Sequence, residues 1–178
     1  MTRQPADTSP ETAPLAGYRI PPGADIGHVH LKVSDLDHAI GFYCGVLGFH
    51  LVARYRDSAA FVAAGDYHHH LGLNTWQSRG AEPPPPRHTG LYHVAIRYPT
   101  RRDLAVAVRR VLAAGIPVQG ASDHGVSVSI YLADPDGNGL ELTWDRPPEQ
   151  WPHTPEGGVE LRMADPFDLD QLLREAGP

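Results

Sequence analysis

The chain has 178 residues, of which 41% are hydrophobic, so it can bury the core of one compact domain without disulfides. Its single cysteine, Cys44, excludes an intrachain disulfide and a cysteine-based zinc site, and it indicates a reducing compartment. The net charge of -6 is spread along the chain without a Lys/Arg cluster, which argues against nucleic acid as a partner. Because the first residues lack a hydrophobic signal core and no long apolar run follows, we expect a cytoplasmic protein without a membrane partner.

A first structural unit, module one (26–77), is expected after a flexible arm over residues 1–24 that is rich in Pro, Thr and Ala. Hydrophobicity alternates along 28–33 as it does in a strand. The Ser-Asp pair at 34–35 can then cap a helix that ends at Gly48. Further strands are expected at 51–55, 59–63 and 67–74.

The same order of elements recurs in module two (91–145). A strand is expected at 93–98, followed by a helix that begins near Arg101 and is closed by Gly115. Further strands are expected at 118–120, 127–132 and 139–144. The repeat therefore predicts an α+β fold of two tandem βαβββ modules.

Proline-rich segments flank the second module. The run of prolines within 78–90 favours an extended linker between the modules, so that the domain spans 25–145. Residues 146–178 form a C-terminal tail, in which the leucine spacing of 168–175 predicts a short amphipathic helix.

Several motifs together point to one family. Residues 26–36 (IGHVHLKVSDL), 42–48 (FYCGVLG) and 134–142 (DPDGNGLEL) have an order and spacing that resemble the vicinal oxygen chelate superfamily of glyoxalases, antibiotic-resistance proteins and extradiol dioxygenases. Two further segments, 65–76 (GDYHHHLGLNTW) and 123–127 (DHGVS), are similar to catechol-2,3-dioxygenase-like proteins. The resemblance implies that the two modules form a cupped mixed sheet around a metal site.

Histidine and carboxylate side chains are the candidate metal ligands. His28 and His93 begin equivalent strands, so packing of the two modules can bring one imidazole from each to a common cup. A single strand histidine is more often an ordinary hydrogen-bonded residue, and it is the recurrence that favours ligation. His30 has the same side-chain parity, but the register of the family favours His28. The resemblance assigns the carboxylate ligand to Glu141, which otherwise is a solvent-facing strand residue.

The ligand set constrains the metal. Two imidazoles and one carboxylate leave open coordination positions, which suits an Fe(II) ion that binds substrate and O2 together, with Mn(II), Zn(II) or Ni(II) as alternatives. A glyoxalase of this fold would be expected to carry a second carboxylate near Gly72, which has no side chain. This departure favours a site with three protein ligands.

Three further residues are candidates for proton transfer. The resemblance implies that Tyr131, ten residues before Glu141, hydrogen-bonds the substrate oxygen, and that His69 is the acid-base group on the dioxygen side. Either His69, or His68 together with His70, can face the cup, because strand faces alternate. His124 is a catalytic candidate in a turn, although extradiol enzymes usually place their comparable histidine further upstream.

The resemblance thus implies a non-haem Fe(II) extradiol dioxygenase of the catechol 2,3-type, which uses O2 to open a catechol-like vicinal diol in aromatic compound degradation. One alternative is a glyoxalase-like metal-dependent isomerase or lyase. Another is a metal-free resistance protein that binds an aromatic ligand or drug. Metal content and O2 consumption separate the three functions, and a homodimer is compatible with all of them.

Overall fold

The computed structural model describes residues 17–85, 87–163, 165 and 167–177. Its elements, in chain order, are β1 (Val29–Lys32), α1 (Leu36–Ile40), the π-helical continuation η1 (Gly41–Val46), β2 (His50–Tyr55), β3 (Ala59–Ala63), β4 (Leu71–Asn74), β5 (Val94–Arg97), α2 (Arg101–Ala113), β6 (Gly120–Asp123), β7 (Ser127–Ala133), β8 (Gly139–Asp145), the short 3-10 helix η2 (Pro148–Gln150) and α3 (Leu169–Glu175).

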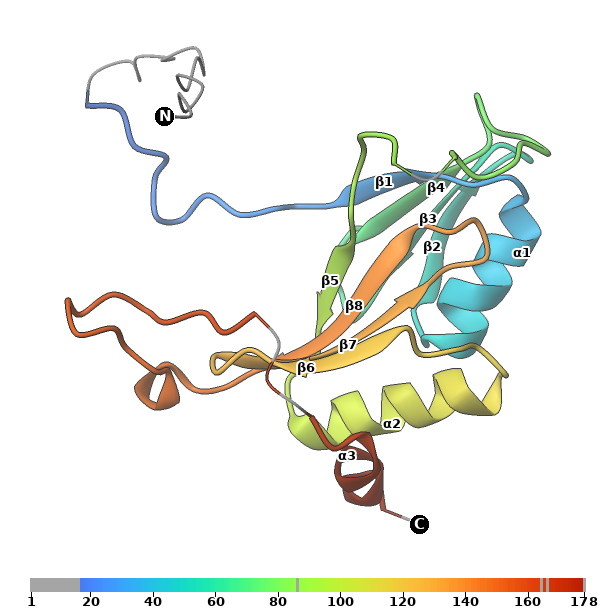
Figure 1. Cartoon of the computed structure of the whole chain (residues 1–178). Coiled ribbons are helices and arrows are strands. Elements are labelled where there is room, and N and C mark those ends of the chain that lie inside the picture. The colour runs from blue at the N-terminus through green and yellow to red at the C-terminus, as the bar shows by residue number, and fades with distance from the viewer. Residues whose placement is uncertain (1–16, 86, 164, 166, 178) are drawn as a thin grey trace, which may run out of the picture.

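The strands form two four-stranded mixed sheets with the same topology, ordered β1-β4-β3-β2 and β5-β8-β7-β6. In each sheet the first strand pairs in parallel with the last, and the other pairings are antiparallel. Figure 1 shows α1 against the first sheet and α2 along the second. The predicted α+β fold of two tandem βαβββ modules is confirmed. Both β1 and β5 are edge strands within the described part of the chain.

The helices form where the sequence combines a cap with an apolar stripe. Asp35 caps α1 by accepting a hydrogen bond from the backbone N–H of His38, and Thr100 caps α2 in the same way. The buried face of α2 includes Leu104 and Val108, each 0% exposed. Burial of such side chains contributes roughly 1.5–3 kcal/mol each. These stripes fix one face of each sheet as core and leave the opposite face for function.

Polar contacts tie the modules together, and two of them are made by the turn between β7 and β8. The Tyr43 hydroxyl of η1 donates to Asp134 of the β7–β8 turn at 2.9 Å, and burial raises the pKa of that tyrosine far above its usual range. The Ser34 backbone N–H donates to Asp136 of the same turn at 2.9 Å. The DPDGN turn therefore positions β8 against module one as well as reversing the chain.

Two predicted strands differ from the observed ones. The segment 67–70 is not part of β4 but belongs to the connection after β3, in which Gly65 has a φ of +61°. A left-handed residue of this kind turns the chain away from the sheet. In module two, β6 occupies 120–123 rather than 118–120. Both errors concern residues beside turns, where alternation is a weak signal.

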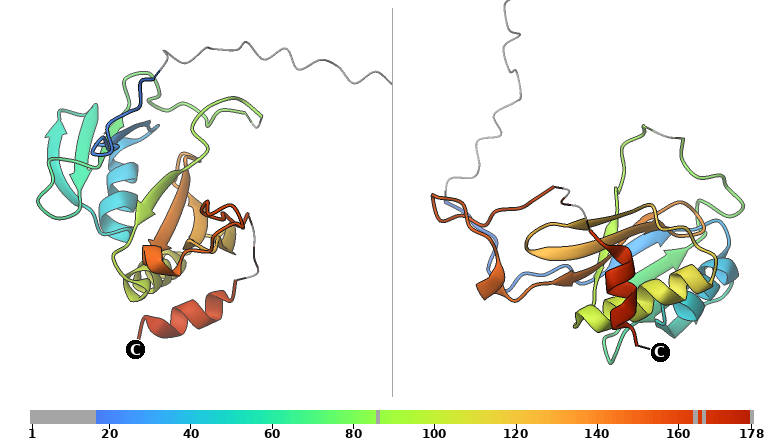
Figure 2. Two further views of the ribbon diagram at one scale, coloured as in Figure 1. Left: turned by 90° about the vertical axis from the view of Figure 1, so that its left-hand side faces the viewer. Right: turned by 60° about the horizontal axis from the view of Figure 1, so that its bottom comes forward.

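The C-terminal segment returns to the body of the protein. Its helix α3 lies beside α2, as both views of Figure 2 show, and buries Leu172 completely. Arg101 of α2 pairs with Glu175 of α3 at 2.8 Å. The bounds of the arm, domain and tail stay predictions, and most of the expected N-terminal arm lies outside the described residues. In the described part of the chain, helices are too short or too polar to cross a bilayer.

Candidate functional site

Module two brings two of the predicted metal ligands into contact. His93 immediately precedes β5, and Glu141 lies in the middle of β8, opposite Ala95. Leu140 and Leu142 are buried on the core face, so the Glu141 side chain occupies the other face. The Nε2 atom of His93 is 2.9 Å from Oε2 of Glu141.

This pair suits a divalent metal. Two ligand atoms at roughly 2.1 Å from one ion stand about 3 Å apart when they occupy neighbouring positions. The separation observed between His93 and Glu141 matches that spacing. The other ring nitrogen of His93, Nδ1, is buried and has no hydrogen-bond partner in the described structure. The imidazole therefore directs its one interacting nitrogen toward the carboxylate.

A tyrosine and a third histidine extend this arrangement. Tyr131 lies on β7 directly opposite Glu141, and its hydroxyl is 3.4 Å from Oε1 of that carboxylate. The same hydroxyl is 2.7 Å from Nε2 of His124, which lies in the turn between β6 and β7. Burial, followed by the charge of Glu141, raises the pKa of Tyr131. The phenol is therefore protonated near neutral pH and can exchange hydrogen bonds with a bound oxygen atom.

Module one carries a second group of histidines. The ring centroids of His28 and His69 are 4.4 Å apart, and Nδ1 of His69 is 2.7 Å from Nδ1 of His68. Desolvation, followed by the neighbouring His28 ring, lowers the pKa of His69. His69 is half-buried while its neighbours His68 and His70 are exposed. The sequence could not decide between them by strand parity, because all three lie before β4 begins.

The position equivalent to Glu141 in module one is occupied by Gly72. Gly72 pairs with His30 across β4 and β1, just as Glu141 pairs with Ala95 across β8 and β5. The His30 ring lies over Gly72 so closely that an added Cβ would be 2.9 Å from it. In module one the His30 imidazole therefore takes the place that the Glu141 carboxylate has in module two. The lack of a carboxylate ligand at Gly72 thus goes together with a ring that fills this place.

The three predicted ligands are not gathered within one chain. His93 and Glu141 are in contact, whereas His28 packs against His69. Over the described ranges, no three His, Cys, Asp or Glu side chains lie close enough together to hold a metal ion. The assignment of His28, His93 and Glu141 as one ligand set stays a prediction, as do the roles of His69, Tyr131 and His124.

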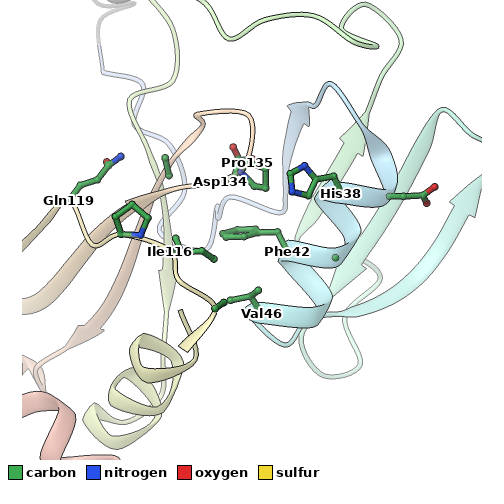
Figure 3. Close-up of a pocket in the computed structure, with 12 residues that line it drawn as sticks. His38, Phe42, Val46, Ile116, Gln119, Asp134 and Pro135 are labelled. Carbon is green, nitrogen blue, oxygen red and sulfur yellow. The ribbon is translucent and has the colours of Figure 1, made fainter. Parts of the chain in front are cut away.

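A cavity that sequence reasoning missed lies on the helical side of the molecule (Figure 3). It has a volume of about 610 Å³ and lies between the α1–η1 helix and the segment that follows α2. Phe42, Val46 and Ile116 form its apolar wall, with His38 and Gln119 at its edge. None of the predicted site residues lines it. From the sequence, Phe42 is expected to be a core or pocket-wall residue, but no motif or spacing predicted a cavity beside this helix.

Known proteins resemble this chain over most of its length. The model of the family described as "Glyoxalase/Bleomycin resistance protein/Dioxygenase superfamily" matches residues 25–142. A catechol-2,3-dioxygenase of Bacillus subtilis is 37% identical over 85% of this chain and 52% of its own length. The chain thus spans about half of that relative. Biphenyl-2,3-diol 1,2-dioxygenase 3 of Rhodococcus globerulus is 30% identical over 83% of this chain and 74% of its own length.

A solved structure is similar in fold. The lactoylglutathione lyase of Agrobacterium tumefaciens has a TM-score of 0.54 and 28% identity to this chain, covering 70% of it and 95% of its own length. Dioxygenases and a glyoxalase-type lyase are therefore both among its relatives.

Proposed function

Because the chain belongs to the glyoxalase/bleomycin resistance protein/dioxygenase superfamily, we propose that it is an Fe(II)-dependent extradiol dioxygenase, which opens a catechol-like vicinal diol with O2. The observation that carries this proposal is the line of contacts from His93 through Glu141 and Tyr131 to His124, which sets two metal donors beside a tyrosine–histidine pair. The names of two relatives, a catechol and a biphenyl-diol dioxygenase, support the substrate class. A role in aromatic compound degradation and a cytoplasmic location accompany this proposal.

The metal is proposed to be held by His93, Glu141 and His28. When bound, an Fe(II) ion supplies open positions for both reactants and a route for electrons between them. Mn(II) offers similar coordination, and Zn(II) or Ni(II) can occupy the same donors without the redox chemistry.

The overall reaction balances without another reductant. The ring carbon–carbon bond beside the diol and the O–O bond both break, and both oxygen atoms enter the ring-opened product. The four electrons that O2 accepts come from the substrate. Within this reaction, Tyr131 stabilises the deprotonated diol oxygen by donating a hydrogen bond, and His69 passes a proton on the dioxygen side.

We propose that His28 reaches the site from a second copy of the chain. Within one chain His28 does not join His93 and Glu141 in a metal-binding group. Yet β1 and β5 are both edge strands among the described residues, and both begin next to a candidate ligand. Large apolar side chains beside them are exposed, including Ile26 at 80% and Tyr92 at 89%. Pairing module one of one copy with module two of another would cover these side chains and complete the ligand set.

Complementation tests this arrangement. His28→Ala and Glu141→Gln variants should each lack a complete metal site when prepared alone. When the two are unfolded together and refolded, mixed dimers should regain one intact site for each pair of chains, measured as bound Fe(II). If the ligands came from one chain, both sites of a mixed dimer would stay incomplete and no metal would return.

Turnover tests the reaction itself. Anaerobically Fe(II)-loaded protein should consume O2 when mixed with members of a catechol panel, and the products should absorb as ring-opened semialdehydes. Tyr131→Phe and His69→Ala should retain the metal but lower kcat by about a hundredfold or more. A glyoxalase-type isomerisation consumes no O2, so metal-loaded protein that is inert to every catechol would contradict the proposal.

A further inference from the structure

The C-terminal segment contacts the candidate site through its backbone. After β8 the chain leaves the second sheet and then returns along the β6–β7 turn (Figure 2). Here the Arg162 backbone N–H donates to the carbonyl of His124 at 3.0 Å. Asp123 and Asp165 exchange backbone hydrogen bonds of 3.3 Å in an antiparallel bridge. The returning segment 151–163, followed by Asp165, thus pairs with the strand end that precedes and includes His124.

The same segment also contacts the His124 side chain. The carbonyl oxygen of Arg162 lies 2.6 Å from Nδ1 of the His124 ring. A carbonyl oxygen can only accept a hydrogen bond, so Nδ1 must carry the hydrogen. In a neutral imidazole the other nitrogen, Nε2, is then an acceptor. Its partner at 2.7 Å is the Tyr131 hydroxyl, which therefore donates to His124.

This direction matters because the Tyr131 hydroxyl has a single proton and lies near acceptors on both His124 and Glu141. The carboxylate of Glu141 lies at 3.4 Å from the hydroxyl, well beyond the 2.7 Å to His124. With the proton directed at His124, the carboxylate is spared a strong hydrogen bond, and the phenol oxygen can accept a hydrogen bond from a bound hydroxyl.

We propose that segment 151–163 is a positioning element of the active site, which holds His124 in its Nδ1–H tautomer and thereby makes it the proton acceptor behind Tyr131. The identity of the bound hydroxyl rests on the proposed function, whereas the tautomer of His124 does not depend on it. As a diol hydroxyl gives its proton to the Tyr131 oxygen, the tyrosine proton passes to Nε2 of His124. The result is a deprotonated diol oxygen that accepts from Tyr131, and an imidazolium whose two N–H groups face Tyr131 and the Arg162 carbonyl.

Local packing holds the turn for this contact. The two terminal guanidinium nitrogens of Arg146 donate hydrogen bonds to the two carboxylate oxygens of Asp123, at 2.8 Å and 2.6 Å. Gly125 follows His124 with a φ of +77°, and an added Cβ there would lie 2.8 Å from Pro152 of the returning segment. Because the turn and the segment are packed this closely, the carbonyl of Arg162 cannot be replaced by water without local separation of the two.

The tautomer is measured first. Full-length protein labelled with ¹⁵N-histidine is examined by long-range ¹H–¹⁵N correlation, and the His124 signals are identified by their loss in His124→Asn. We expect a neutral ring with its hydrogen on Nδ1. An Nε2–H tautomer in the wild-type protein overturns the proposal without any further variant.

The second measurement breaks the backbone contact. Arg162→Pro removes the N–H that donates to the backbone carbonyl of His124, and so loosens the pairing that holds the Arg162 carbonyl against Nδ1. Leu161→Ala changes an exposed neighbouring side chain and no backbone donor. Arg162→Pro should lose the single-tautomer signature and lower kcat by about 10- to 100-fold with little change in KM, as for other groups that orient a reactive side chain. Leu161→Ala should match the wild type.

The outcomes separate this inference from the proposed function. If Arg162→Pro keeps both the Nδ1–H signature and the wild-type kcat, the segment does not position His124. If the signature depends on Arg162 but no catechol is consumed, the positioning stands and the dioxygenase proposal fails.

Discussion

The two modules have the same topology, but their functional faces are built differently. In module two, His93, Glu141, Tyr131 and His124 contact one another from adjacent strands and a turn held by an ion pair. In module one, the histidines lie on a strand end and in a loop, and they meet chiefly through ring contacts. A hydrogen-bonded set on adjacent strands keeps its geometry without a ligand, whereas rings that touch at an angle in a loop can rearrange at little cost.

Two glycines, one in β8 and one in β4, show the same contrast between the modules. Gly139, at the start of β8, faces the Tyr92 backbone, and an added Cβ would lie 2.1 Å from the carbonyl oxygen. For Gly72, in the matching strand β4, the three atoms nearest to an added Cβ all belong to the side chain of His30. Module two thus fixes its first ligand, His93, through backbone packing. Module one instead has the movable His30 ring near its own predicted ligand, His28. We infer that module one adapts when the site is completed.

The largest expected effect tests whether module two provides the rigid half of a metal site. Glu141→Gln removes the only anionic ligand of the predicted set and should weaken Mn(II) or Fe(II) binding by about a hundredfold or more, since even partners outside the ligand set contribute 10- to 100-fold. Anaerobic calorimetry measures the affinity. The matched control is Glu149→Gln, an exposed carboxylate on η2. Equal affinity in the two variants would remove Glu141 from the site.

Next in size is the effect of a single methyl group on the backbone of module two. Gly139→Ala forces β8 away from Tyr92 and should lower the free energy of unfolding by about 1–3 kcal/mol, the usual cost of overpacking. Urea denaturation measures it. Gly120→Ala is the control, because its added Cβ would meet its nearest neighbour, the Tyr131 ring, at an ordinary 3.6 Å. A Gly139→Ala protein as stable as this control would show that β8 is not held by the backbone of Tyr92.

The same substitution in module one should cost less. The nearest contacts of Gly72→Ala are with the exposed His30 ring, which can rotate away, so the loss should stay below about 1 kcal/mol. Combining it with His30→Ala removes the clash and should abolish the loss. The same urea measurement applies. If Gly72→Ala were as costly as Gly139→Ala, the proposed difference in rigidity between the modules would be wrong.

The sequence was informative where a repeat or a motif constrained both residue type and position. The recurrence of His28 at His93 predicted the two modules, and the DPDGN turn placed Glu141 on the face away from the core, as observed. It was less informative about His69, because a left-handed glycine moved the histidine triplet off the strand. Alternation along a segment cannot register a turn set by one φ angle.

Other features depended on contacts between distant segments. The His30 ring over Gly72 joins positions that lie on different strands, and the contact of Arg162 with His124 joins the tail to a turn in module two. Neither pair carries a local pattern. The separation of His28 from Glu141 likewise depends on how the two sheets are packed, which hydrophobic periodicity does not encode.

The smallest expected effect concerns the ion pair that holds the turn of module two. The hydrogen bond from Arg146 holds the pKa of Asp123 below its usual value near 3.9. A carboxyl group whose pKa is lower in the folded state contributes stability above the unfolded pKa, and this contribution is lost as the pH falls through the folded value.

Asp123→Asn should therefore destabilise the protein at pH 7, and the difference from wild type should shrink below about pH 4. Urea midpoints between pH 7 and pH 3 measure it, with Asp66→Asn in the exposed loop of module one as the control. A pH-independent difference would mean that Asp123 acts through packing and not through its charge. An equal response from Asp66→Asn would show that the electrostatic effect is not specific to the turn of module two.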